Sequence, residues 1–244
     1  MKLTRWYFAA FFLAATCTFC LSSCDEDDNN NPDYNLSFKV KPLVNGQPFQ
    51  MGVDYTSPES QRFMYEKFLF YLSKVKLIAA DGSAQPVSEV LWYDLGNPKT
   101  VNIKIPEGQY NALQFSLGLD SLMNSSDPTD YEEGHPLSYS QNNYWTWASK
   151  YIFAKLEGRC DNNLSGTGYA GAFSYHLGLD TLYREKSVPR NFTITNSAVT
   201  NVELIINVDQ IFDGIDIVED NFTHSTSDFA LARQIMDNFV AATQ

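Results

Sequence analysis

Short runs of alternating apolar and polar residues, each followed by a turn-forming dipeptide, recur along this chain. In the first run Leu36, Phe38 and Val40 alternate with polar neighbours, and Asn45-Gly46 follows shortly afterwards. Residues two apart share a face of an extended chain, and Asn-Gly is a strong hairpin signal. A half-buried strand that ends in a tight turn is therefore predicted at 34–46.

The same pattern continues almost to the C-terminus. Further strands are predicted at 67–80, 90–95, 101–105, 110–119, 151–156, 172–179, 191–195 and 201–208. The helical periods that a parallel sheet needs are missing, and only 228–242 has apolar residues at helical spacing, with Ser227 or Asp228 able to cap it. The sequence predicts an all-β fold: an antiparallel β-sandwich with long loops at 122–143 and 158–171 and one C-terminal helix.

The N-terminus has the features of a bacterial lipoprotein signal. Lys2 and Arg5 precede an apolar stretch at 6–21, which ends in Leu21-Ser22-Ser23-Cys24, a lipobox pattern. We expect residues 1–23 to be a signal peptide, 24–33 an acidic flexible tether, and 34–244 the folded domain. Acyl chains on Cys24 would then anchor the protein to the membrane. This predicts an outer membrane lipoprotein of a Gram-negative bacterium, on the periplasmic face or the cell surface.

Charge and cysteine content limit the partners and the fold. The formal net charge is −12, and the signal segment contributes only basic groups, so an acidic surface is expected to disfavour nucleic acid and to suit cationic partners, metal ions included. Of the four cysteines, Cys17 and Cys20 leave with the signal and Cys24 is lipidated. Cys160 alone remains, so no intramolecular disulfide is predicted.

Motifs for catalysis are missing from the sequence. It contains no Gly-x-Ser-x-Gly elbow, phosphate-binding loop or dinucleotide fingerprint. Its histidines, His135, His176 and His224, do not have the close spacing of a zinc protease or zinc finger. We therefore do not expect an enzyme.

An aromatic run at 144–153 (YWTWASKYIF) has three interpretations. If the run is extended, Trp145, Trp147, Ser149, Tyr151 and Phe153 line one side. That side could belong to the sandwich core, form a platform for sugar stacking together with Tyr144, or place an oxidisable indole beside a metal. Indoles buried beside a histidine would favour metal binding, whereas coplanar indoles in an open groove would favour glycan binding.

Ordered motifs across the domain carry a resemblance to a known family. They are Tyr71-Leu72-Ser73, Lys76-Leu77, Asp81-Gly82, Gly108-Gln109-Tyr110, His135-Pro136-Leu137, Tyr144-Trp145-Thr146-Trp147-Ala148-Ser149, Tyr151-Ile152-Phe153, Lys155-Leu156-Glu157-Gly158, Phe173-Ser174-Tyr175-His176-Leu177-Gly178 and Thr223-His224-Ser225. In this order they resemble the MbnP-like family of copper-associated exported proteins. The resemblance implies a β-sandwich that binds copper through histidines and a tryptophan-derived kynurenine. It also implies a di-haem, peroxidase-like partner enzyme that makes this oxidation.

Carried over to this chain, the resemblance implies His135 and His176 as copper ligands and His224 as a third candidate. Trp145 or Trp147 is the residue that would be oxidised, and Lys150 stands where the family commonly has glycine. The predicted function is that of a lipid-anchored, extracytoplasmic copper-binding protein. The alternative is a surface glycan-binding or adhesive β-sandwich lipoprotein.

Overall fold

The computed structural model describes residues 33–146 and 149–244. Its strands are β1 (Leu36–Val44), β2 (Gln47–Pro48), β3 (Tyr55–Thr56), β4 (Arg62–Ala79), β5 (Ala84–Asp94), β6 (Thr100–Ile103), β7 (Gly108–Leu117), β8 (Tyr144–Trp145), β9 (Lys150–Asp161), β10 (Gly171–Gly178), β11 (Arg184–Ile194), β12 (Thr200–Asn207) and β13 (Phe222–Thr223). The helices are α1 (Ser121–Asn124) and α2 (Phe229–Ala242), with 3₁₀ turns η1 (Pro128–Asp130), η2 (Tyr139–Gln141), η3 (Asp180–Leu182) and η4 (Gln210–Phe212). The predicted signal peptide, Cys24, nearly all of the tether, and Trp147 lie outside the described residues.

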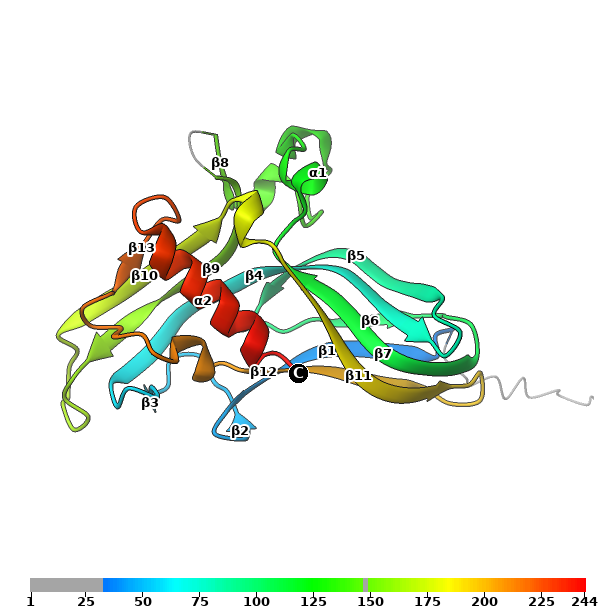
Figure 1. The fold of residues 1–244 in the computed structure, drawn as a ribbon, viewed down its shortest axis with the longest axis horizontal. Coiled ribbons are helices and arrows are strands. Elements are labelled where there is room, and N and C mark those ends of the chain that lie inside the picture. Colours follow the sequence, from blue (N-terminus) through cyan, green and yellow to red (C-terminus); the bar gives the residue numbers. More distant parts are fainter. Residues whose placement is uncertain (1–32, 147–148) are drawn as a thin grey trace, which may run out of the picture. The chain divides into compact units, whose positions relative to one another are not determined.

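The strands form two sheets, so the predicted all-β fold is confirmed (Figure 1). The smaller sheet has the order β12-β1-β2, with β6 also paired to β1. The larger has the order β11-β7-β4-β9-β10-β13, with β3 and β5 paired to β4. Most pairs are antiparallel, as predicted, but β1 with β12 and β10 with β13 are parallel. Each of these two parallel pairs joins strands that are not consecutive in the sequence. Other elements therefore connect the paired strands, and no single crossover helix is required.

Alternation along β1 explains how the sheets pack. Leu36, Phe38 and Val40 are buried and face the core, while Lys39 between them is exposed. Asn45 and Gly46 both have positive φ, the conformation of the tight hairpin turn predicted there. The register that buries one face of β1 is therefore fixed by its pattern and its turn.

The C-terminal helix α2 lies across the larger sheet (Figure 1). Its Phe239 ring packs against Phe68 and Phe70 of β4, at centroid distances of 5.5 and 5.2 Å. The Asp228 side chain accepts a hydrogen bond from the Leu231 backbone N–H, so Asp228 is the N-cap. Lys186 Nζ donates to backbone carbonyls at the other end of the helix, where a cation is favourable. Neither described helix is long and apolar enough to cross a membrane.

The connection between β7 and β9 positions the candidate site. Strand β4 pairs with β9 along Arg62–Phe70 and with β7 along Leu72–Ala79, so the connection leaves the sheet near Tyr71. The Tyr71 hydroxyl donates to the Pro136 carbonyl at 2.9 Å, and the Tyr151 hydroxyl donates to the Leu137 carbonyl at 2.8 Å. These bonds to buried tyrosines hold the long connection on the end of the sheet.

Candidate metal site

Parallel pairing of β10 with β13 brings two histidines together. Ser174 pairs with Phe222 and Tyr175 with Thr223, so the next residues along both strands are His176 and His224. Their imidazole rings stack with centroids 4.7 Å apart and planes inclined by 3°. Sheet register thus joins two histidines that are far apart in the sequence.

An indole completes this group. The Trp145 ring centroid lies 5.5 Å from that of His176 and 5.0 Å from that of His224. Trp145 is half-buried, and the ring of Phe222, which is 50 % exposed, lies 4.4 Å from the His224 ring. We call His176, His224 and Trp145 the imidazole–indole cluster.

The chain after β13 is fixed to β10 by Ser225. Its hydroxyl donates to the His176 carbonyl at 3.0 Å and accepts from the Gly178 backbone N–H at 2.8 Å. The Ser227 hydroxyl accepts from the backbone N–H of His224 at 2.9 Å. The backbones that carry both imidazoles are therefore held in place by hydrogen bonds.

A carboxylate orients the first imidazole. His176 Nε2 lies 2.7 Å from Glu157 Oε1, and Lys67 Nζ lies 2.7 Å from the other oxygen of Glu157. Burial opposes ionisation of Glu157, but the hydrogen bonds from Lys67 and His176 outweigh it and lower its pKa. An ionised carboxylate only accepts hydrogen bonds, so the Nε2 atom of His176 carries the proton.

The other ring nitrogen of His176 makes no hydrogen bond to any residue that the structure describes. Nδ1 is buried and receives no hydrogen bond from the described part of the chain. Burial lowers the pKa of His176, although its hydrogen bond to Glu157 acts in the opposite direction, and burial also lowers the pKa of His224. Burial therefore favours the neutral form of both imidazoles, which is the form that binds metal ions.

The structure places His135 in a different set of contacts. Its ring stacks on Tyr131 at 4.5 Å with planes inclined by 9°, and its Nδ1 accepts from the Leu137 backbone N–H at 3.1 Å. Among the described residues, no ring contact or hydrogen bond joins His135 to His176 or His224. The geometry therefore pairs His176 with His224, the residue given only third place from the sequence.

The aromatic run is not one continuous strand, so Trp145 does not share a face with Tyr151 and Phe153 as it would in an extended run. Tyr144 of β8 pairs with Tyr151 of β9, and Trp145 pairs with Lys150. The chain reverses between them, and Lys150 has a φ of 64°, a left-handed conformation that suits glycine. Tyr151 and Phe153 are fully buried in the core, whereas Trp145 lies half-buried against the histidines.

Few other metal donors are available near the cluster. In residues 33–146 and 149–244, no group of three or more His, Cys, Asp or Glu side chains is arranged to hold a metal ion. Cys160 is fully buried, and burial raises the pKa of its thiol to about 11, so it is an unreactive core residue. The described chain thus offers two imidazoles, with the glutamate behind one of them.

These observations define a class of protein. It is a two-sheet β-sandwich with a pair of histidines and an indole beside β10 and β13 of its larger sheet. The family model described as MbnP matches residues 33–228, and the chain belongs to the MbnP family. Among solved structures it is similar to MbnP from Methylosinus trichosporium, at 15 % sequence identity and a TM-score of 0.48, over 73 % of this chain and 77 % of that one. No curated protein matches the sequence.

Proposed function

We propose that this protein binds copper through His176 and His224, beside Trp145. The observation that carries the proposal is a stacked imidazole pair beside the Trp145 ring, in which Nδ1 of His176 is buried and has no hydrogen-bond partner among the described residues. Membership of the MbnP family supports copper as the metal. In this proposal the protein binds or carries the ion and is not itself a catalyst.

The residues present fit copper chemically. Neutral imidazole is a suitable copper ligand, and burial lowers the pKa of both rings, which favours that form. A ligating histidine usually donates its other N–H to a carboxylate or carbonyl group, which fixes the ring and raises its basicity. Glu157 does this for His176, so Nδ1 is the nitrogen left to bind the ion.

Two protein nitrogens leave room for a further ligand, and modification of Trp145 would supply one. Opening the indole ring oxidatively to kynurenine creates a carbonyl and an aniline nitrogen where neither existed. Trp145 is the described tryptophan that contacts both histidines, so we propose it as the modified residue. Trp147 remains the second candidate. A di-haem, peroxidase-like partner enzyme would supply the oxidising equivalents.

The location in the cell is proposed from the N-terminal motif. Cys24 would carry the lipid and the acidic segment after it would act as a tether, which places the domain on the outer membrane. Either the periplasmic face or the cell surface agrees with this arrangement. The glycan-binding alternative is less favoured, because the described indole lies against two imidazoles.

Metal content and intact mass of the protein purified from its native cell envelope test the proposal. We expect one copper per chain, lost in His176→Ala and in His224→Ala. His135→Ala is the matched control, because it removes the same side chain from a different set of contacts and should retain copper. A peptide covering Trp145, shifted by the mass difference between tryptophan and kynurenine, would support the modification.

Two results would contradict the assignment. Loss of copper in His135→Ala, with retention in His224→Ala, would restore the pairing of His135 with His176. Absence of copper from the wild type after loading, together with unmodified tryptophans, would show that this member of the family does not use the cluster to bind copper.

A further inference from the structure

A polar cavity unrelated to the cluster lies where η4 meets the last turn of α2. Its volume is about 600 Å³, within the range of small-molecule sites. Polar groups of the lining come from Asn45, Ser57 and Asn238. Two carboxylates also line the cavity: Asp209 precedes η4 and Asp213 follows it.

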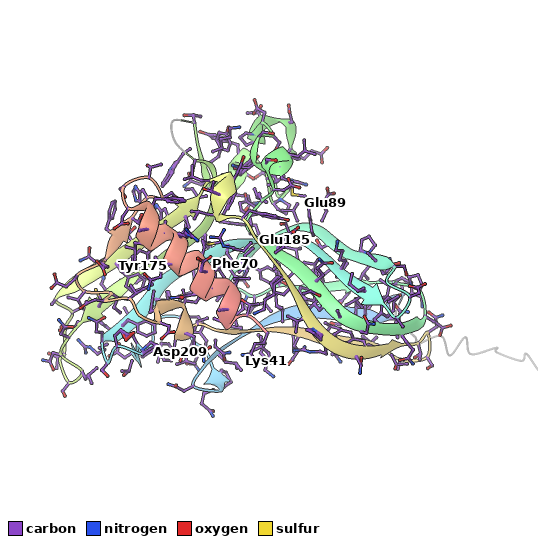
Figure 2. The ribbon with its side chains drawn as sticks, viewed as in Figure 1. Lys41, Phe70, Glu89, Tyr175, Glu185 and Asp209 are labelled. Carbon is purple, nitrogen blue, oxygen red and sulfur yellow. The ribbon has the colours of Figure 1, made fainter. Side chains whose placement is uncertain are left out.

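Asp209 is a buried carboxylate with one oxygen that has no hydrogen-bond partner among the described residues. It is 8 % exposed, and its Oδ1 is fully buried and accepts no hydrogen bond from the described part of the chain. Figure 2 labels Asp209 beside η4. Burying a carboxylate without compensation is strongly unfavourable, so such a group calls for an explanation.

Other aspartates in equivalent positions are used by the fold. Asp120, Asp127 and Asp228 stand at the N-caps of α1, η1 and α2, and each accepts a backbone N–H. Asp209 stands at the N-cap of η4, yet its side chain makes no capping bond. Local secondary structure therefore does not account for its burial.

The charge around the cavity indicates what would compensate Asp209. The described residues that line it include both aspartates and no lysine, arginine or histidine. A bare metal ion is disfavoured, because no three acidic, histidine or cysteine side chains in the described residues are arranged to hold one. The volume exceeds the needs of a single ion, and the lining combines amide and hydroxyl groups with the apolar side chains of Pro58 and Ala242.

We propose that this cavity binds a small, polar organic ammonium ion, with Asp209 as the charge partner of the ammonium group. The ammonium donates to the buried carboxylate, which makes a charge-assisted hydrogen bond. Asp213 and the neighbouring amides bind the polar remainder of the molecule. This site is independent of copper binding, because its residues do not overlap with the imidazole–indole cluster.

Calorimetric titration of the full chain, purified in detergent, tests the proposal with glucosamine as the probe and glucose as its uncharged counterpart. At a pH where the amine is protonated, we expect saturable binding of glucosamine and no binding of glucose. Asp209→Asn should weaken glucosamine binding on the order of 30-fold or more, because a buried charge partner is lost. Asp130→Asn is the control, since it removes the same charge from an exposed side chain, and should bind as the wild type does.

Thermal stability without any probe gives a second readout. Asp209→Asn keeps the shape of the side chain and removes an uncompensated charge, so the melting temperature should stay the same or rise. A fall would show that Asp209 has a structural role and would overturn the proposal. Two titration results would also overturn the proposal: equal binding of glucose and glucosamine, and binding of neither sugar. A third is binding of Ca²⁺ that Asp209→Asn abolishes.

Discussion

At the scale of single residues, Lys150 shows why a family can prefer glycine at one position. Its φ of 64° is left-handed and costs a residue with a Cβ about 1–2 kcal/mol, whereas glycine adopts it freely. We predict that Lys150→Gly stabilises the protein by up to about 1 kcal/mol, after the entropy of glycine in the unfolded chain is subtracted. Urea denaturation measures this. Lys150→Ala keeps the Cβ and should give no gain; an equal gain would mean that removal of the lysine charge is responsible.

Glu157 is the other residue whose role can be tested alone. We predict that Glu157→Gln lowers copper affinity about 10- to 100-fold, because the glutamine amide no longer fixes the proton on Nε2 of His176. Nitrogen NMR of the metal-free protein should show His176 as the Nε2–H form in the wild type and as a mixture of tautomers in the variant.

Glu66→Gln is the matched control for that experiment. Glu66 is an exposed glutamate of the same sheet, bonded to Arg159 and not to a histidine. It should change neither the tautomer nor the affinity. An unchanged tautomer in Glu157→Gln would mean that packing, and not the carboxylate, orients the ring.

At the scale of elements, α2 depends on its cap. We predict that Asp228→Ala destabilises the protein by about 1 kcal/mol, because the Leu231 N–H loses its acceptor. Asp228→Asn retains an acceptor at the same place and should stay close to wild type. Denaturant midpoints distinguish the two. Equal losses in both variants would mean that the negative charge at the helix N-terminus, and not the hydrogen bond, is what matters.

The sequence predicted the regular elements well because their signals are local. Alternation in β1, the Asn45-Gly46 turn and the apolar stripe of α2 each lie within one segment, and the structure has all of them. The sequence does not reveal the hairpin of β8 and β9, because its aromatic residues continue to alternate through the point where the chain reverses. The parallel pair of β1 with β12 depends on residues at opposite ends of the domain, so no local pattern indicates it.

At the scale of the whole molecule, the candidate site depends on contacts that no spacing reveals. His176 and His224 meet because Tyr175 pairs with Thr223, and Trp145 reaches them from a hairpin on another strand. The resemblance implied these residues as candidates, but their grouping comes from the sheet register. His135 illustrates the limit: its motif matches the family, while its ring packs on Tyr131.

If copper binds this cluster in the native state, it must stabilise the entire domain. The ligands come from β10, the end of β13 and β8, so the copper site is lost when the domain unfolds. Copper at 100 times its dissociation constant should therefore add about 2.7 kcal/mol to the free energy of unfolding. For a domain of this size that is roughly 5–10 °C in melting temperature, measurable by calorimetry with and without copper. His135→Ala should show the same rise, whereas His176→Ala and His224→Ala should show none. A rise that survives in His176→Ala and His224→Ala would locate the stabilising copper elsewhere, because the cluster would then lack both of its imidazole donors.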